Sequence, residues 1–199
     1  MVPTILETPG NSQVVDVTVF DFKKQLVSLL NDPFLFGNID HLDVNQSDPF
    51  SKYKAHNRVL LSTVNSGMRY KLAYETCVTC QGSDFLVPII FACDETKVSN
   101  QGKASCWPLL FTTSILNQEM QNLPAAWRPL GYIYDVSLTT STNQEKQFGV
   151  NLKYTHLHQI LKSILASYIN CQKSTALTNM NLKLGGVQKV VNLKVPCFL

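Results

Sequence analysis

Three apolar stretches in the middle of the chain have the pattern of β-strands. Each is rich in β-branched and aromatic residues and is bounded by polar or turn-forming residues, and together they cover 85–93, 105–116 and 130–138. Only about a dozen residues join the first to the second, with SNQGK (99–103) as the turn, and this short link favours an antiparallel hairpin over a crossover. The pattern therefore predicts three strands in an antiparallel meander.

A long amphipathic helix is predicted after the third strand. In YTHLHQILKSILASYIN (154–170), apolar side chains recur at the spacing of one helical face. They are Leu157, Ile160, Leu161, Ile164, Leu165 and Tyr168. A Leu-Gly-Gly turn at 184–186 leads into the last apolar stretch, VQKVVNLKVPCFL (187–199), which is predicted to be a strand. A right-handed crossover through the helix would place this strand parallel to the first and beside it.

The predicted order of elements is β-β-β-α-β, which makes a mixed α/β fold. This order is that of the opening half of an RNase H-like fold, and we expect an incomplete core of that kind over residues 85–199. Ligand sites gather at the carboxyl ends of adjacent parallel strands, so a site is expected where the first strand ends.

Residues 1–84 are predicted to form an arm of helices and loops in front of this core. One helix is expected within Val17–Leu30, and Asn31-Asp32-Pro33 ends it. A second helix is expected over MRYKLAYETCV (68–78). The apolar face of the first helix consists of Phe22, Leu26, Leu29 and Leu30.

Composition adds limits to this picture. The 199 residues suit one domain, 45% of them are apolar, and the net charge of +3 permits contact with nucleic acid without requiring it. The N-terminus MVPTILETPGNS lacks the positive region and long apolar core of a signal peptide, and no apolar run reaches the roughly 18 residues that a bilayer span needs. We therefore expect a nuclear or cytoplasmic protein that is neither secreted nor held in a membrane, with its cysteines as free thiols.

The first predicted strand ends abruptly in two carboxylates, Asp94 and Glu95. A charge at the tip of a buried strand is costly unless it is paired, hydrated or bound to metal. Adjacent residues of a strand point to opposite faces, so Asp94 shares a face with Thr96, and Glu95 shares the other with Lys97. Two interpretations stay open here: Asp94 as a metal ligand, and Asp94 as a strand-end residue that caps the next turn.

The same region resembles a known family. Residues LVPIIFACDETKVSNQGKASCWPLLFTTSILNQEMQNLPAAWRPLGYIYD (86–135) combine an apolar strand, D-x-T, a polar turn, a W-P strand and the run W-R-P-L-G-Y-I. Upstream, FDFKKQLVSLLNDPFLFGNIDHLDVNQSDPFSKY (20–53) and VNSGMRY (64–70) are similar as well. Over about residues 18–199, this arrangement resembles Plavaka-type transposases, which are relatives of the CACTA cut-and-paste elements.

The resemblance implies a DDE-type transposase, an enzyme that cleaves and transfers DNA strands with an RNase H-like catalytic domain. It implies that Asp94 is the first catalytic, metal-binding carboxylate and that Mg²⁺ or Mn²⁺ is the cofactor. It also implies a second carboxylate after the fourth strand, whereas this chain stops at VPCFL. We therefore expect a fragment that is truncated before the second catalytic carboxylate and is inactive by itself.

The partner that the resemblance implies is DNA, at transposon ends. Lys97, Lys103 and Arg128 flank the expected site and are candidates for contacts with phosphates. Asp135, at the end of the third predicted strand, is a further acid that could lie nearby. An incomplete sheet would leave apolar surface exposed, so we also expect marginal stability, self-association or pairing with a full-length transposase.

Two other functions remain open from the sequence. A non-catalytic protein could bind DNA or a transposase, and the acid-free stretch KLGGVQKVVNLKVPCFL (183–199) permits this. An unrelated enzyme could use a thiol nucleophile such as Cys93.

The cysteine and histidine pairs give little indication of a metal site. Cys77-x-x-Cys80 has no second pair at zinc spacing. His156 and His158, two residues apart, share no helical face and are expected at the surface near the helix start.

Overall fold

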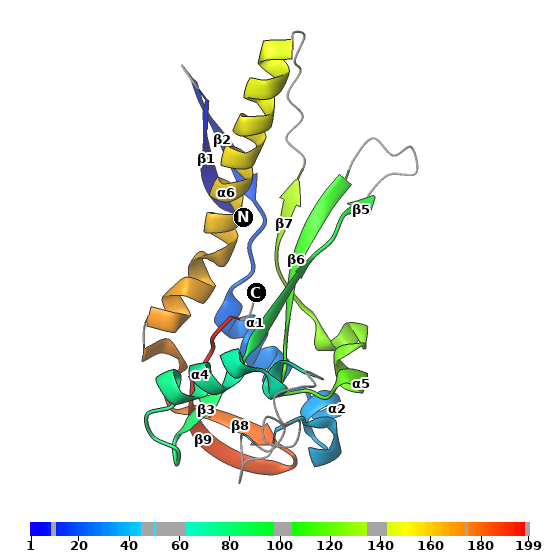
Figure 1. Cartoon of the computed structure of the whole chain (residues 1–199), viewed down its shortest axis with the longest axis vertical. Helices are drawn as coiled ribbons and strands as arrows, with labels where there is room; N and C mark the ends of the chain where they lie inside the picture. Colours follow the sequence, from blue (N-terminus) through cyan, green and yellow to red (C-terminus); the bar gives the residue numbers. More distant parts are fainter. Residues whose placement is uncertain are drawn as a thin grey trace.

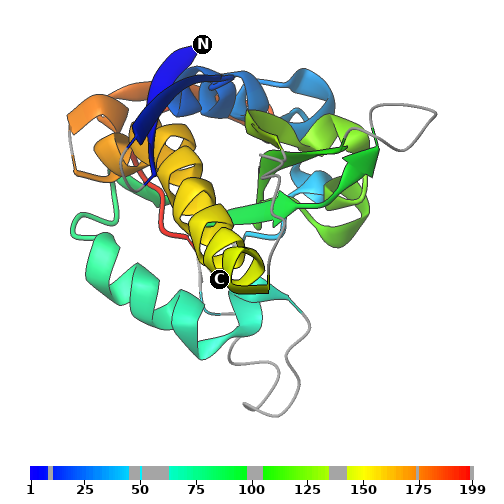
Figure 2. The ribbon, with the colours of Figure 1, turned by 90° about the horizontal axis from the view of Figure 1, so that it is seen from above.

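A computed structural model describes residues 1–8, 11–44, 50, 63–97, 105–134, 143–173 and 175–197. These residues form a mixed α/β fold with several helices and more than one sheet. Figure 1 shows the long helix α6 (Asn143–Lys173) running beside the β1–β2 hairpin (Val2–Thr8 and Asn11–Val17), with the central antiparallel strands on its other side. The view from above in Figure 2 shows the same arrangement.

The central strands are β4 (Ile89–Cys93), β6 (Ser105–Thr113) and β7 (Arg128–Tyr134). β6 lies in the middle and pairs antiparallel with both neighbours, with Phe111 opposite Phe91 and Trp107 opposite Ile133. This confirms the predicted antiparallel hairpin and meander. The predicted second strand was too long at its end, because Ser114 and Ile115 form a turn after Thr113.

The last segment of the chain lies parallel to the first central strand, as the crossover rule predicts. β3 (Asp84–Leu86) pairs in parallel with β9 (Val187–Lys194), and Pro88 separates β3 from β4. The pairing continues beyond it, since the amide of Ile89 donates to the carbonyl of Pro196 at 2.8 Å and Ile89 forms a parallel bridge with Cys197. The strands therefore lie in the order β7, β6, β4, C-terminal segment.

The outer edge of β7 is covered by residues 18–20. Val19 bridges to Gly131, and the amide of Phe20 donates to the carbonyl of Leu130 at 2.8 Å. A Cβ atom on Gly131 would lie 2.7 Å from the carbonyl oxygen of Thr18 and 2.8 Å from Cγ1 of Ile164. Only glycine allows the strand, its neighbour and α6 to approach this closely.

The predicted arm is helical only in part. Residues 2–17 form the β1–β2 hairpin, so the prediction of helices and loops is wrong there. The hairpin packs on α6, where Thr4 Oγ1 donates to Ser163 Oγ at 2.9 Å and Leu6 is fully buried. The alternation of inward and outward side chains was present in the sequence, but its packing partner is about 160 residues away.

The two helices expected in the arm are present. α1 (Phe22–Leu30) begins at Asp21, whose side chain accepts from the amide of Lys24 at 2.8 Å, and its predicted apolar face is buried. α4 (Met68–Cys77) is the second. The remaining elements are short: α2 (Pro33–Phe36), η1 (Ile39–His41), η2 (Val64–Ser66), β5 (Thr96–Lys97), α5 (Gln118–Gln121), η3 (Pro124–Ala126), η4 (Thr175–Leu177) and β8 (Met180–Leu184).

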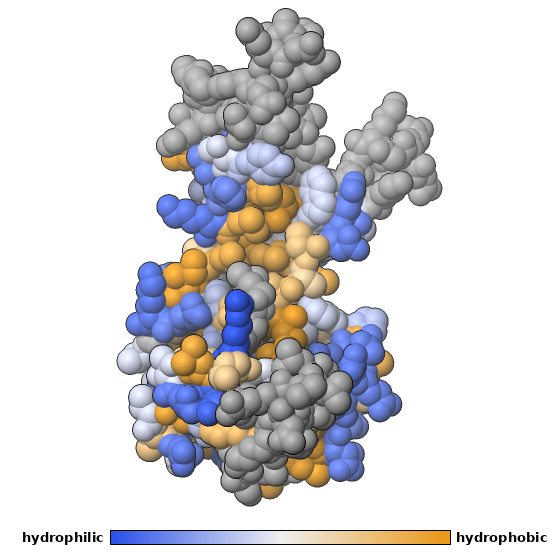
Figure 3. Space-filling model, viewed as in Figure 1, coloured by the Kyte–Doolittle hydropathy of each residue, from blue (hydrophilic) through white to orange (hydrophobic). Residues whose placement is uncertain are grey.

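One hydrophobic core includes residues from the predicted arm and from the predicted core alike. Phe22 of α1 packs against Phe111 of β6, with ring centroids 5.1 Å apart. Figure 3 shows apolar side chains reaching the surface where α6 and the central strands come together. In the part of the chain that the structure describes, no helix combines the length and the apolar character needed to cross a bilayer.

Candidate functional site

Asp94 lies directly after β4, in a break within a single long strand. The register runs without a slip from Cys93 opposite Leu109 to Thr96 opposite Cys106. In this register Asp94 therefore lies opposite Pro108, which has no amide hydrogen to donate to a neighbouring strand. The Asp94 side chain is exposed, and its Oδ1 accepts from the amide of Glu95 at 2.8 Å.

The direction of Asp94 follows from the strand's alternation. The Phe91 ring packs against Tyr168 of α6, with centroids 5.2 Å apart, so the odd-numbered positions of β4 face that helix. By the same alternation, the Asp94 side chain lies with those of Ile90 and Ala92 on the face of the strand that points away from α6. Hydration of the exposed carboxylate explains why a charge is tolerated at the end of an apolar strand.

The parallel neighbour of β4 runs toward the same end. Cys197 lies beside Ile89, and both segments point their carboxyl ends toward Asp94. In an open α/β sheet, such ends of adjacent parallel strands are where ligands bind. The parallel segment is described only as far as the bridge to Ile89, at the start of β4, so a second strand end beside Asp94 stays a prediction.

Other acids do not join Asp94 within the described residues. There, no group of three or more His, Cys, Asp and Glu side chains is placed to hold a metal ion. Asp135 lies outside the described residues. The strand that leads toward it ends at Tyr134, which pairs with Cys106, and Cys106 pairs on its other side with Thr96. The full width of β6 thus separates the end of β7 from β5.

The structure describes the three basic candidates for phosphate contacts to different extents. Lys103 lies outside the described residues, and Lys97 is described only as part of the backbone of β5. Arg128 is well defined at the start of β7. No finding tests the contact of these residues with phosphates, which stays a prediction.

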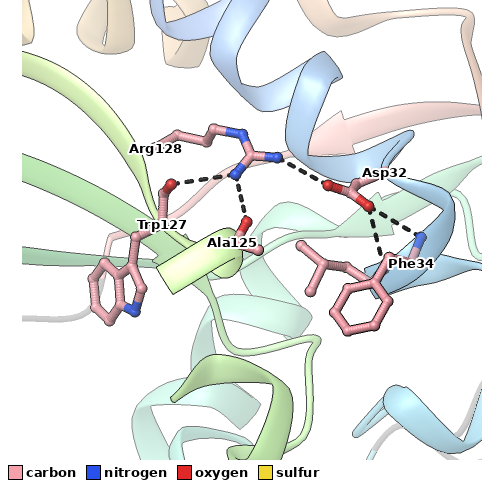
Figure 4. A network of polar contacts seen from close by, with 6 residues as sticks. Asp32, Phe34, Ala125, Trp127 and Arg128 are labelled. Atoms are coloured by element: carbon pink, nitrogen blue, oxygen red, sulfur yellow. Dashed lines mark hydrogen bonds and ion pairs between the residues drawn. The ribbon is translucent and has the colours of Figure 1, made fainter. Parts of the chain in front are cut away.

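Arg128 is held by an ion pair and two carbonyl groups (Figure 4). Its Nη2 lies 3.2 Å from Oδ2 of Asp32, while Nη1 donates to the carbonyls of Ala125 and, at 3.2 Å, of Trp127. Asp32 also caps α2, because its Oδ1 accepts from the amide of Phe34 at 3.0 Å. The two charged side chains are 16% and 24% exposed, so the pair joins α2 to β7 in a partly dehydrated setting.

We expect Arg128→Gln to lower the free energy of unfolding by about 1–3 kcal/mol, because Asp32 would lose a charged partner. Urea denaturation of Arg128→Gln, Asp32→Asn and the double variant would measure the coupling between the two residues. Unchanged stability together with weaker DNA binding in Arg128→Gln would contradict this structural role and favour a phosphate contact instead.

A sequence model of the Plavaka transposase family matches residues 9–193. The chain belongs to the Plavaka transposase family. The match includes every central strand, α6 and the β8–β9 hairpin, and it confirms the resemblance seen in the sequence. A comparison with curated proteins finds no match.

The thiols of this Plavaka-family chain give little support to a nucleophile at Cys93. Desolvation, and then the charge of Asp94, raise the pKa of the Cys93 thiol, which lowers its thiolate fraction. The pKa of the exposed Cys80 thiol is lowered, chiefly by a hydrogen bond from the Ser83 side chain. Cys77 and Cys80 are both free thiols.

The prediction that both histidines lie at the surface is correct for one of them and wrong for the other. His158 is exposed, but His156 is only 3% exposed, and neither of its ring nitrogens has a hydrogen-bond partner among the described residues. The surface prediction for His156 is wrong because α6 begins at Asn143, so His156 lies inside the helix and not at its start.

Sequence reasoning missed Asp84, which lies at the start of β3. Its Oδ2 accepts from the amide and hydroxyl of Thr79 at 3.0 and 2.9 Å and from the amide of Cys80 at 3.1 Å. Its Oδ1 accepts from Nδ2 of Asn192 at 3.1 Å, and Nζ of Lys194 lies 3.8 Å from Oδ2. The Asn192 bond is the largest cause that lowers the pKa of Asp84 to about 2. The nearby turn was visible in the sequence, whereas Asn192, 108 residues further on, was not.

Proposed function

We propose that this protein takes part in DNA strand cleavage and transfer, as the part of a DDE transposase that carries the first catalytic carboxylate, Asp94. The observation that carries the proposal is the exposed Asp94 at the end of β4, with a parallel segment beside the start of that strand. The strand order β7, β6, β4, C-terminal segment supports an RNase H-like core, in which the first and last strands are adjacent and parallel. Family membership supports the reaction class.

The chemistry of this class requires several carboxylates. Divalent metal ions, when held by such carboxylates, would stabilise the charge that develops on the phosphodiester. Mg²⁺ and Mn²⁺ take oxygen ligands, and the Asp94 carboxylate is a suitable one. Among the described residues no group of three or more possible ligands surrounds it, so these residues do not form a complete site for either ion. We accordingly propose that Asp94 supplies one ligand, and that this chain does not cleave DNA by itself.

Binding of Mn²⁺ to the full chain tests the role of Asp94. We expect a weak site whose affinity falls roughly tenfold or more in Asp94→Asn, because a direct ligand contributes at least as much as the groups that orient ligands. Water proton relaxation, which reports bound Mn²⁺, would measure it. Glu95→Gln is the matched control: it removes an adjacent exposed carboxylate that points to the other face.

Equal Mn²⁺ affinity in wild type and Asp94→Asn would contradict the metal role. It would favour the plainer interpretation, in which Asp94 is a strand-end residue that binds the next amide, as it does toward Glu95.

A non-catalytic DNA-binding or transposase-interacting protein is the second candidate. The observation that favours it is the β8–β9 hairpin with the segment after it, which carries Lys183, Lys189 and Lys194 and no acid over residues 180–197. Lysines of this kind bind phosphates through charge, and the affinity falls steeply with salt. Duplex binding that is salt-dependent and unchanged in Asp94→Asn, with no Mn²⁺ site, would favour this function.

A further inference from the structure

A pocket of about 320 Å³ lies between α4 and the sheet formed by β3, β9 and β8. It is separate from Asp94, which does not line it. Its size is at the lower end of the roughly 300–1,000 Å³ typical of ligand pockets, so it suits a single ring system with a small attached group. The aromatic and polar residues that line it are Tyr70, Tyr74, Gln81, Asp84, Phe85 and Lys189.

Two tyrosines give the pocket its aromatic wall. Tyr70 and Tyr74 are four residues apart on α4 and therefore lie on one face of the helix. The Phe50 ring contacts Tyr74 edge-on, with centroids 5.1 Å apart, which helps to hold the Tyr74 ring in place. Burial, and then Tyr74, raise the pKa of Tyr70 to about 12, so its hydroxyl stays neutral and can both donate and accept hydrogen bonds.

The charges around the pocket discriminate between parts of a ligand. The Asp84 carboxylate is nearly saturated by Thr79, Cys80 and Asn192, and Nζ of Lys194 lies 3.8 Å from its Oδ2. It therefore needs no charged partner from a ligand, and a neutral ring can lie beside it. The exposed Lys189 is the cationic residue of the lining and suits an anionic group that stays near the opening.

We propose that this pocket binds the base of an unpaired nucleotide in DNA, with its phosphates outside. Aromatic walls bind bases of any sequence by stacking, and the neutral hydroxyl and amide groups match the polar edge of a base. The proposal rests on the proposed function only in that the ligand is DNA. It requires neither Asp94 nor a metal ion, so the two can fail separately.

Photo-crosslinking of the full wild-type chain gives the most direct test. The probe is a short single-stranded oligodeoxynucleotide with one 5-iodo-2′-deoxyuridine, and the crosslinked peptide is identified by mass spectrometry. We expect the crosslink on Tyr74 or Phe85, which are half-buried, and not on Tyr70, which is only 3% exposed. A crosslink confined to residues outside the pocket, or no binding of the single strand, would overturn the proposal.

Variants of Tyr74 provide an independent measurement of affinity. Tyr74→Ala should weaken binding of the single strand by about 5–150-fold, the range expected when one stacked base is lost, and Tyr74→Phe should bind like wild type. Leu72→Ala is the matched control, because Leu72 is 61% exposed on the same helix and does not line the pocket. Circular dichroism would verify that each variant folds. If Tyr74→Ala does not fold, the crosslink on the wild-type chain still tests the proposal.

Two further results would contradict the binding of a base in this pocket. Equal losses in Tyr74→Ala and Leu72→Ala would mean that α4 acts as a whole and not through the ring. If Tyr74→Ala converts a dimer into a monomer without changing affinity for the single strand, the occupant is a side chain of a second copy.

Discussion

Tyr168→Ala is expected to lower the free energy of unfolding by about 3–5 kcal/mol, the cost typical of removing a large buried aromatic ring. Tyr168 is 5% exposed and lies in the C-terminal part of α6. Its ring makes edge contacts with Phe22 and Phe91, with centroids 4.9 and 5.2 Å apart. It therefore connects α6 to both α1 and β4, and no neighbouring side chain can fill its volume without moving one of these elements.

The Tyr168 hydroxyl adds a bond to the C-terminal segment. It donates to the carbonyl of Val195 at 3.0 Å, and Nε2 of Gln172 donates to both the hydroxyl and that carbonyl, at 2.7 and 3.1 Å. Tyr168→Phe should therefore cost only about 0.5–1.5 kcal/mol, since Gln172 still serves the carbonyl.

Urea denaturation would measure both Tyr168 variants against Tyr154→Ala. Tyr154 is on the same helix but 60% exposed, so its replacement should change stability by less than about 0.5 kcal/mol. Losses of similar size in Tyr168→Ala and Tyr154→Ala would mean that the ring contacts do not stabilise this core.

Acid should destabilise the protein through Asp84. The pKa of this carboxyl is about 2 in the folded chain, against 3.8 for an ordinary Asp, chiefly because Asn192 donates to it. A lowered folded-state pKa means that the unfolded state binds the proton more tightly. The contribution of Asp84 is therefore fully present above about pH 5 and is lost as the pH falls through 4 toward 2.

Asp84→Asn should remove most of this pH dependence and lower stability near neutral pH by about 1–3 kcal/mol, since bonds to a charged acceptor are lost. The measurement is the urea midpoint of wild type and variant at several pH values between about 6 and 2. Asp94→Asn is the control, because it removes an exposed carboxylate that lies outside the hydrogen bonds of Asp84. An equal slope in wild type and Asp84→Asn would contradict the assignment to Asp84.

The position of the candidate site could be predicted from the sequence, but the residues that surround it could not. The end of an apolar strand followed by Asp94 can be read from adjacent residues, and the crossover rule predicted the parallel segment that lies beside the start of that strand. The role of Arg128 could not be read this way, because its carboxylate partner, Asp32, is 96 residues earlier. The pocket on α4 also combines residues from distant segments, and only folding brings Tyr70, Phe85 and Lys189 together.

The sequence by itself determined the central strands, the face of α1, the long helix α6, the parallel placement of the last strand and the family. Each of these depends on a short-range pattern, on a general rule of chain connection or on the order of motifs along the chain. Only the tertiary structure decided that residues 2–17 form a hairpin on α6, that His156 is buried, and that Asp84 joins β9. The physical reason is the same in each case: the stabilising partner lies far away in sequence, and local propensity carries no information about a contact that exists only after the chain has packed.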